Sequence, residues 1–244
     1  PSQDFEPEFI TVSGRYAYVT LQEANSVAIV DWVSAELVGV KGLGLKSWEK
    51  SWIGFDASDR DDSYTTTIWP VQNMYMPDAI ASMRVGGKTY LVTANEGDGV
   101  EYFAGPVSDD EDQELCYSDE ARVKDLPLDP SVFVDGIGDD DKLGRLKVTT
   151  SYPSVKGEDG YTRLAAYGGR SFAVWVTSGK VVFDSGSGLE AIIRASITEE
   201  EWLENHDGRS DDKGPEPEGV AVGAPYGMPT IFVGLERSGG IMVF

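Results

Sequence analysis

The feature that most constrains the fold of this chain is a short motif that occurs near both of its ends. Residues 6–12 read EPEFITV and residues 216–222 read EPEGVAV, so proline and acidic residues precede a run of strand-forming side chains in both places. The segment PDAIASM, from Pro77, has the same order of proline, acid and apolar run. Such recurrence predicts a repeated structural unit, because each copy of a repeat builds the same supersecondary element.

A second motif follows the first and repeats with it. The segment YVTLQEANSVAIV from Tyr18 aligns without a gap with FVGLERSGGIMVF from Phe232, and LVTANEGDGV from Leu91 aligns with their first ten positions. A weaker fourth copy, LAAYGGRSFAVWVTSGKVVFDSG, starts at Leu164. The sequence therefore predicts about four copies of one β unit.

Each unit is expected to contain four short strands. In the first copy, turn residues at Ser13-Gly14 and Ala24-Asn25 separate runs rich in β-branched and aromatic residues, and residues 16–21 alternate with the period of two that strands require. Four antiparallel strands repeated radially describe the blade of a β-propeller. We therefore predict an all-β fold, a β-propeller, with residues 1–244 forming a single propeller domain or a fragment of a larger propeller. A β-sandwich is the alternative, but it does not predict the recurring proline-acid start.

The repeat pattern lapses between residues 101 and 160. Acidic runs occur at 108–114 and 138–142, and PLDPSVF contains two prolines, so this stretch is predicted to be an inserted acidic loop region. Residues 197–205, ITEEEWLEN, are predicted to form one short helix, because Thr198 can cap a first turn that contains three glutamates.

The charge balance excludes some functions. The net charge of −22 comes from 42 acidic and 20 basic residues, so the chain would repel nucleic acid and attract cations. Surplus surface acids also serve solubility, which remains the simpler interpretation of the charge. The single His206 and the single Cys116 argue against zinc sites built on imidazole or thiolate ligands. No apolar run approaches the roughly 20 residues of a transmembrane segment, and no anchor or signal is recognised.

The repeated acids predict a metal site. Equivalent positions of a propeller converge on its axis, so acids that are distant in sequence would meet there and need a cation to offset their repulsion. Calcium accepts six to eight oxygen ligands from carboxylates and amides, which makes it the predicted cofactor. The predicted ligands are Glu23, Asn95, Glu96, Asp98, Glu216, Glu218 and Glu236, with Glu8, Asp78, Asp56, Asp59 and Asp61 as further candidates. The alternative is that the proline-acid pairs only begin edge strands and that the other acids are solvated surface residues.

The sequence contains no recognisable hydrolase nucleophile. A Gly-x-Ser-x-Gly motif and a phosphate-binding loop are both absent from it. If the chain is an enzyme, water activated by a bound metal is the simplest mechanism. The candidate catalytic residues would then be Glu218, Arg209 and Arg237, with an arginine holding a phosphate.

Several segments resemble the choice-of-anchor I family. They are YVTLQEANSVAIVD, GFDASDRD, WPVQNMYMPDAIAS, YLVTANEGD, RVKDLPLDPSVF, LGRLKVTT, RSDDKGPEPEGV and FVGLERSGGIMVF. That family includes bacterial surface proteins, some labelled alkaline phosphatase-like, and animal mesenchyme-specific cell surface glycoproteins linked to biomineralisation. The resemblance implies a secreted or cell-surface β-propeller whose anchoring signal varies. The stretch EYFAGPVSDDEDQELCYSDEARV is longer than the family's usual passage between its NEGD and RVKDL motifs.

Three functional hypotheses follow. The first is an extracellular acidic β-propeller that binds divalent cations, with calcium as the expected ion, and has a surface, matrix or biomineral-associated role in which mineral or other surface proteins are partners. The second is a calcium-dependent phosphoesterase, alkaline phosphatase-like or phytase-like, that uses the same carboxylates. The third is a filament or partner-docking module without a site of its own.

Overall fold

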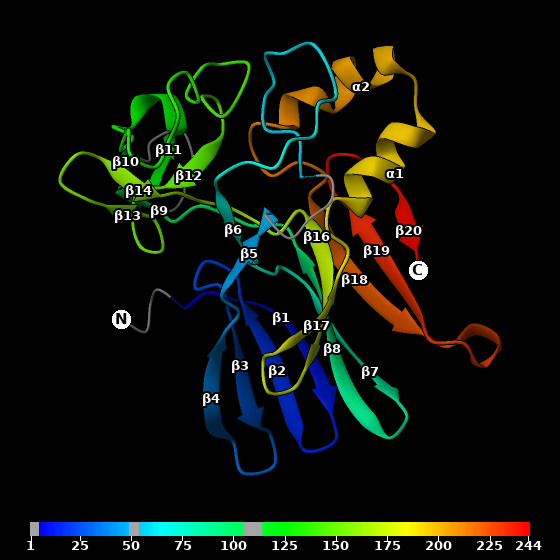
Figure 1. Cartoon of the computed structure of the whole chain (residues 1–244). Coiled ribbons are helices and arrows are strands. Elements are labelled where there is room, and N and C mark those ends of the chain that lie inside the picture. The colour runs from blue at the N-terminus through cyan, green and yellow to red at the C-terminus, as the bar shows by residue number, and fades with distance from the viewer. Residues whose placement is uncertain (1–4, 49–53, 105–113) are drawn as a thin grey trace.

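The computed structural model describes residues 5–48, 54–104 and 114–244, and most of its regular structure is β-strand. The strands form several separate sheets, and none of the sheets formed by these residues closes on itself. The all-β prediction is therefore confirmed at this level, whereas the sheets by themselves do not confirm a propeller. Figure 1 shows the N-terminal sheet and the C-terminal sheet on either side of strands from the middle of the chain.

The N-terminal sheet is a four-stranded antiparallel meander in which each strand pairs with the next along the chain. The tight turns predicted at Ser13-Gly14 and Ala24-Asn25 separate its first three strands, and Gly14 and Asn25 have the positive φ values that such turns require. This unit agrees with the predicted strands. Its strands are β1 (Pro7–Ser13), β2 (Tyr16–Leu21), β3 (Ser26–Asp31) and β4 (Glu36–Gly42).

The second sheet is assembled from two distant parts of the chain, in the order β17-β16-β8-β7. Its strands are β7 (Ile80–Val85), β8 (Lys88–Asn95), β16 (Ser171–Val176) and β17 (Val181–Asp184). The segment from Leu164 was predicted to be a fourth repeat, and that prediction is wrong. Its strands β16 and β17 instead complete the sheet that β7 and β8 begin, because β16 pairs with β8 over six residues.

The third sheet contains β18 (Pro217–Gly223), β19 (Thr230–Leu235) and β20 (Ile241–Val243), again as an antiparallel meander. The second sheet lies between the other two. Tyr18 and Val27 of the first sheet pack against Leu91 and Trp175 on one of its faces, and Val233 of the third sheet packs in a cluster with Val92 and Phe172 of the other. Three sheets are thus stacked face to face, with a separate apolar cluster at each of the two interfaces.

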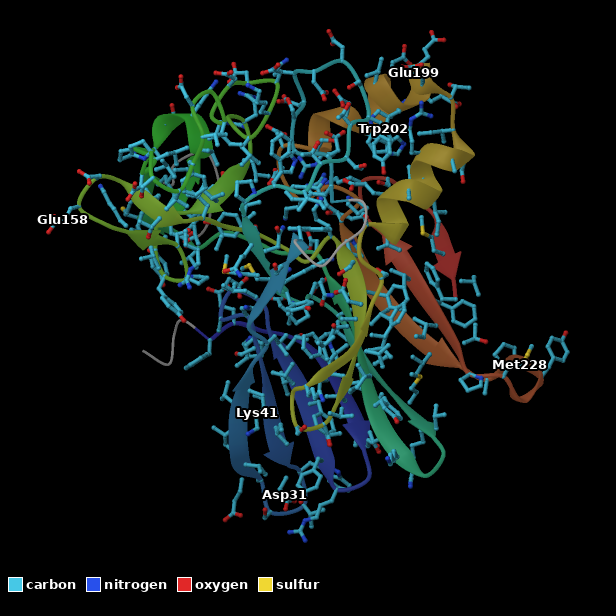
Figure 2. The ribbon with its side chains drawn as sticks, viewed as in Figure 1. Asp31, Lys41, Glu158, Glu199, Trp202 and Met228 are labelled. Atoms are coloured by element: carbon cyan, nitrogen blue, oxygen red, sulfur yellow. The ribbon has the colours of Figure 1, made fainter. Side chains whose placement is uncertain are left out.

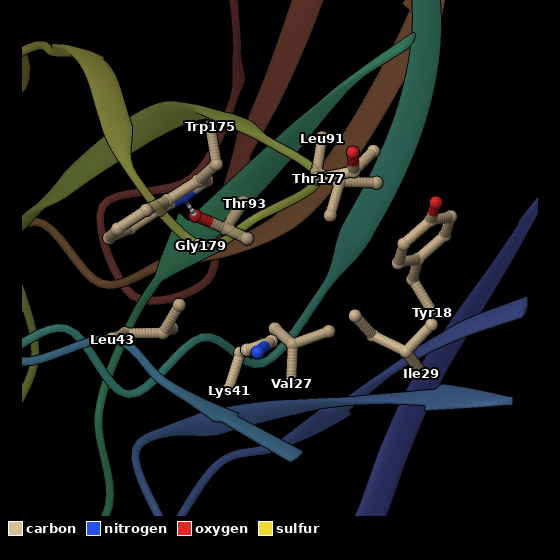
Figure 3. A pocket seen from close by; sticks show the side chains of 10 residues that line it. All are labelled: Tyr18, Val27, Ile29, Lys41, Leu43, Leu91, Thr93, Trp175, Thr177 and Gly179. Carbon is tan, nitrogen blue, oxygen red and sulfur yellow. Dashed lines mark hydrogen bonds between the residues drawn. The ribbon is translucent and has the colours of Figure 1, made fainter. Parts of the chain in front are cut away.

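The first strands of the first two sheets lie side by side. The Thr11 hydroxyl donates a hydrogen bond of 3.1 Å to Ser82 Oγ, and Thr20 donates one of 2.7 Å to the carbonyl oxygen of Asp78. Farther from these strands, the interface contains a small cavity of about 10 Å³, where Trp175 Nε1 donates a hydrogen bond of 2.8 Å to Thr93 Oγ1 (Figure 3). That cavity is large enough for about one water molecule, so these sheets are closely packed.

The residues between β8 and β16 form a separate lobe, seen in green in Figure 1. Its core includes Val123, Leu143, Leu146 and Leu164, together with Trp48 and Phe55 from the preceding segment. The lobe covers most of the predicted insertion, although residues 108–113 of its first acidic run lie outside the described residues. Its strands, with two that precede it, are β5 (Leu45–Ser47), β6 (Gln72–Met74), β9 (Glu101–Ala104), β10 (Glu114–Ser118), β11 (Glu120–Arg122), β12 (Lys147–Thr149), β13 (Val155–Lys156), β14 (Tyr161–Arg163) and β15 (Ala165–Ala166).

Two helices, α1 (Gly188–Ser196) and α2 (Glu199–Asn205), follow the second sheet. The predicted Thr198 cap is confirmed, because Thr198 accepts a hydrogen bond from the Glu201 backbone and the Glu201 side chain accepts one from the Thr198 backbone. Among the helices in the described part of the chain, none has the length and apolar character needed to cross a bilayer. Figure 2 shows acidic side chains such as Glu158 and Glu199 projecting from the surface.

Candidate cation site at the strand ends

The candidate site lies where the start of one strand meets the end of its neighbour. In the third sheet Pro217 pairs with Leu235, and the Glu236 backbone N–H donates a hydrogen bond of 3.0 Å to the Glu216 carbonyl oxygen. In the second sheet the Gly97 N–H donates one of 3.1 Å to the Met76 carbonyl oxygen, just before Pro77. The repeated motif therefore brings the residue that precedes its proline to the turn that follows the second strand.

Glu96, Glu216 and Glu236 converge at this point. Each contributes a carboxylate oxygen, and the three oxygens lie within 4.8 Å of one another, although the residues come from two sheets and are up to 140 positions apart. Glu216 is fully buried, Glu96 is nearly buried and Glu236 is exposed, so the group extends from the interior toward solvent. Burial raises the pKa of Glu216, whereas the neighbouring Arg209 guanidinium acts in the opposite direction.

Each of these carboxylates has a basic neighbour. Lys213 Nζ lies 2.9 Å from Glu96 Oε1, Arg209 Nε donates a hydrogen bond to Glu216 Oε1, and Arg237 Nη2 lies 3.2 Å from Glu236 Oε1. Among the described residues, one buried oxygen of this cluster is left without a hydrogen bond. Glu216 Oε2 is buried and accepts none from the described residues, and its nearest ion-pair contact is Arg237 Nε at 3.6 Å.

Gln22 supplies a further polar contact to this cluster. Its amide Nε2 donates a hydrogen bond of 3.3 Å to Glu96 Oε2, and the Gln22 side chain is itself buried. Gln22 occupies the position of the repeat that Asn95 and Glu236 hold in the other two copies. The repeat therefore contributes side-chain oxygen and nitrogen atoms to one place from all three sheets.

A second acidic group lies near the start of β1. Carboxylate oxygens of Glu6, Glu8 and Glu23 also lie within 4.8 Å of one another, and Glu23 Oε2 is buried without a hydrogen bond from the described residues. Burial raises the pKa of Glu23 to about 7, and the charges of Glu6 and Glu8 add to this effect. Glu6 and Glu8 are exposed, so this second group is more open to solvent than the first.

Asp78 is affected by the charges of acids from both groups. Burial raises its pKa to about 7, and the charges of Glu96, Glu218, Glu8 and Glu236 raise it further. Glu218 itself is exposed, in contrast to its neighbour Glu216 on the other side of Pro217. The predicted acids of the repeat are therefore gathered in one region, with Glu216 rather than Glu218 in the buried cluster.

Asn95 and Asp98 differ in their surroundings. Asn95 is fully buried and already engaged within the second sheet, since its Oδ1 accepts a hydrogen bond of 2.7 Å from Thr93 and its Nδ2 donates one of 3.4 Å to Ser171. Asp98 is exposed and lies 3.6 Å from Lys213 Nζ. Asp98 therefore borders the cluster, whereas the oxygen of Asn95 is used inside the sheet.

Three further predicted acids lie elsewhere, near the helices. Asp59 forms a two-bond ion pair with Arg145, and although its partial burial works in the opposite direction, these hydrogen bonds hold its pKa below the ordinary value. Asp61 accepts hydrogen bonds from Ser63. Asp56 is buried and accepts a hydrogen bond of 3.1 Å from Ser210 Oγ, and burial together with the Glu190 charge raises its pKa to about 8. These three acids therefore have hydrogen-bond partners of their own and do not belong to the strand-end clusters.

A polar pocket of about 200 Å³ opens beside the Glu96 cluster. Its charged lining residues are Asp98, Glu101, Glu120, Lys147, Arg209, Asp212 and Lys213. Lys147 lies 2.9 Å from Glu120 and 3.3 Å from Asp212, so its charge is used inside the pocket. Four acids against three bases leave the pocket with no surplus of positive charge for binding an anion unaided.

Sequence reasoning missed three residues of this region: Glu6, Gln22 and Lys213. Glu6 could have been found, because it aligns with Glu216 in the repeated EPE motif. Gln22 could also have been found, since it aligns with Asn95 and Glu236. Lys213 lies before the repeat begins, so its contact with Glu96, 117 positions away, has no counterpart in the sequence pattern.

The fold and the site together define an acidic protein of stacked antiparallel sheets with carboxylates gathered at strand ends. The chain belongs to the choice-of-anchor I family, because the choice-of-anchor I domain model matches residues 1–244.

Two curated proteins are similar to parts or all of the chain. Gigasin-3a of Magallana gigas is 33% identical over 125 residues, which cover 46% of this chain and 42% of that protein. The mesenchyme-specific cell surface glycoprotein of Strongylocentrotus purpuratus is 26% identical over 281 aligned residues, which cover 100% of this chain and 35% of that protein. The chain therefore spans less than half the length of these relatives. A solved structure, Kuenenia stuttgartiensis hydrazine synthase, matches 98% of this chain and 83% of its own at 14% identity, with a TM-score of 0.19, which is too low to indicate a shared fold.

Proposed function

We propose that this chain is part of an extracellular, cell-surface protein that binds a divalent cation, calcium, at Glu96, Glu216 and Glu236. The observation that carries the proposal is the fully buried Glu216, whose Oε2 accepts no hydrogen bond from the described residues while two other carboxylates lie beside it. A buried charged oxygen without a hydrogen bond is costly, and a cation is the partner that would satisfy it.

The donor set favours a hard cation. Three carboxylates and a nearby amide offer oxygen ligands, and among the described residues no thiolate or imidazole belongs to this group. Calcium accepts such ligands at variable coordination number, and the exposed side of Glu236 leaves room for water to complete the shell. The backbone also supports the arrangement, since Glu216 has φ +46°, a conformation that non-glycine residues adopt at a cost and that persists mainly where a function requires it.

The surface location is supported by the family and by one relative's name, which describes a cell surface glycoprotein. A matrix or mineral-associated role for this chain is part of the proposal. We further propose that the three stacked sheets are blades of a larger propeller. The cross-strand register supports this, because the outer face of the first sheet carries Ile10, Val12, Val40 and the small Ala17 and Ala28, an apolar set like those buried between the sheets.

Thermal unfolding with added calcium and with a chelator tests the cation site. A ligand that binds only the folded state raises its stability, so calcium should raise the melting temperature and the chelator should reverse the shift. Glu216→Gln keeps the size of the side chain and removes its charge, and it should abolish the calcium shift. Glu158→Gln, at an exposed loop position, is the control and should keep it. An equal shift in the wild type and in Glu216→Gln would refute the site.

A phosphoesterase is the second candidate, favoured by the basic residues Arg209 and Lys213 that lie next to the carboxylates. In that case a metal bound at the cluster would activate water and the bases would hold the phosphate. Turnover of a phosphomonoester that requires calcium and is lost in Glu216→Gln would support it. Calcium binding without turnover would support the binding function and exclude the phosphoesterase. If neither binding nor turnover were observed, a docking module would be favoured.

A further inference from the structure

Lys213 places a positive charge directly beside Glu96. Its ammonium nitrogen lies 2.9 Å from Glu96 Oε1, at hydrogen-bond distance, and 3.6 Å from an oxygen of Asp98. The Lys213 side chain is only 16% exposed, so the pair is not a loose surface contact. Glu96 is the one member of the carboxylate cluster that this lysine contacts.

The backbone that carries Lys213 is held in place by the buried Arg170. Arg170 donates hydrogen bonds to the carbonyl oxygens of Ser210, at 3.0 Å, and of Asp212, at 3.4 Å. Gly214 packs directly on the same guanidinium, since a Cβ at this position would meet it at 2.4 Å. Because both sides of Lys213 are fixed, the movement available to its charge is a change of side-chain rotamer.

A displaced Lys213 would have other acidic partners within the same pocket. Lys213 lines the pocket of about 200 Å³ together with Asp98 and Glu101. The ammonium can therefore leave Glu96 without losing every favourable charge contact. Displacement by a sodium ion would exchange one unit charge for another, whereas a divalent ion brings twice the charge to the same carboxylates.

We propose that Lys213 is a specificity-determining residue, a resident counter-ion that a divalent cation must displace from Glu96. This inference rests on the proposed cation site and adds to it the feature that sets its affinity. In the cation-free protein Lys213 neutralises Glu96, and in the bound protein its amine turns into the pocket. The lysine thus lowers the affinity for every cation and leaves enough net binding only for a divalent one.

The first test is a calcium titration of Lys213→Met, which keeps most of the aliphatic stem and removes the charge. Isothermal titration calorimetry should show calcium affinity increased on the order of tenfold, because one like charge at close range is removed. Lys147→Met is the matched control, since Lys147 lines the same pocket but pairs with Glu120 and Asp212. An unchanged or weaker affinity in Lys213→Met, or an equal increase in Lys147→Met, would overturn the inference.

The second test measures the amine directly in the wild-type protein. Acylation of lysines, followed by peptide mass spectrometry, should show faster modification of Lys213 when calcium is present and unchanged modification of Lys147. Equal Lys213 reactivity with and without calcium would overturn the displacement. If calcium binds while Lys213 stays unreactive and Lys213→Met has no effect, the proposed function survives and this inference fails. If neither the wild type nor Lys213→Met binds calcium, both fail.

Discussion

Two polar regions of this molecule use the same residue types in opposite ways. In the strand-end cluster, the basic partners of Glu96 and Glu236 are 16% and 59% exposed, and Glu216 keeps one oxygen without a hydrogen bond from the described residues. At α1, Arg170 and Glu190 are 1% and 2% exposed and form an ion pair, and Glu190 Oε2 likewise accepts no hydrogen bond from the described residues. Under the proposed function the first region would exchange a basic side chain for an ion, whereas the second is too deeply buried to exchange anything without opening the fold. The two regions therefore differ in how deeply the basic partner of each carboxylate is buried, and this depth distinguishes the candidate cation site from the structural ion pair.

The largest expected effect comes from breaking the buried pair. Arg170→Met should destabilise the fold by about 3–5 kcal/mol, because it leaves Glu190 as an unpaired buried charge and removes the hydrogen bonds to Ser210 and Asp212. Urea denaturation followed by tryptophan fluorescence would measure the loss. The double variant Arg170→Met, Glu190→Met should recover part of the stability, and a single variant as stable as the wild type would contradict a structural role for this pair.

The next effect concerns the backbone that positions Glu96. Gly97 and Gly168 both have positive φ, and a Cβ on Gly168 would lie 1.8 Å from the Glu96 carbonyl oxygen. Gly168→Ala should therefore cost about 2–4 kcal/mol and also remove the calcium shift, because the Glu96 backbone must move.

Gly87→Ala is the matched control for that prediction. Gly87 also has positive φ, but a Cβ there meets nothing within 4 Å. It should cost only about 1 kcal/mol and leave the calcium shift unchanged. If calcium still raised the melting temperature of Gly168→Ala, the site would not depend on the contact between Gly97 and Gly168.

A smaller effect is the pH dependence that the buried region adds. Burial and the Glu190 charge raise the pKa of Asp56 to about 8, so the unfolded chain releases this proton near pH 4 and the folded chain only near pH 8. In this interval the folded state binds more protons, so its stability falls as pH rises from roughly 4 to 8.

Asp56→Asn should remove this part of the slope. Asparagine imitates the protonated acid, since it can accept from the Ser58 N–H and donate to Ser210 Oγ. We expect its free energy of unfolding to exceed that of the wild type at pH 8 and to differ little from it at pH 4, as measured by urea unfolding at both values. Equal slopes in the two proteins would show that Asp56 is already ionised at neutral pH.

The sequence predicted the local strands better than their assembly. β1 to β4 follow from alternation and turn residues, which act over a few positions, and the α2 cap is equally local. The partners of β16 could not be predicted in this way, because it pairs with β8 across an insertion of more than 70 residues. Pairing over that distance depends on the complementary apolar faces and leaves no periodic signal near either strand.

The acids of the site were predictable as a group, because the repeat brings the start of its first strand next to the turn that follows its second strand. Which of Glu216 and Glu218 turns inward was not predictable, since the two residues flank Pro217 symmetrically in the sequence. The choice depends on the positive φ of Glu216, a backbone conformation that no residue type at this position indicates. Lys213 was missed for a related reason, as its place beside Glu96 results from tertiary packing around Arg170.

The smallest predicted effect tests whether the two regions are independent. Thr198→Ala removes the hydroxyl that caps α2, and loss of such a cap costs about 1 kcal/mol. Because Trp202 of α2 packs in an apolar cluster with Leu189 and Ile193 of α1, and α2 supplies none of the strand-end acids, the variant should lower the melting temperature both with and without calcium by the same amount. The calcium-induced difference should therefore be unchanged. A smaller difference in Thr198→Ala would mean that stability of the helical region is transmitted to the site, with the segment between Asp207 and Glu216 as the connection.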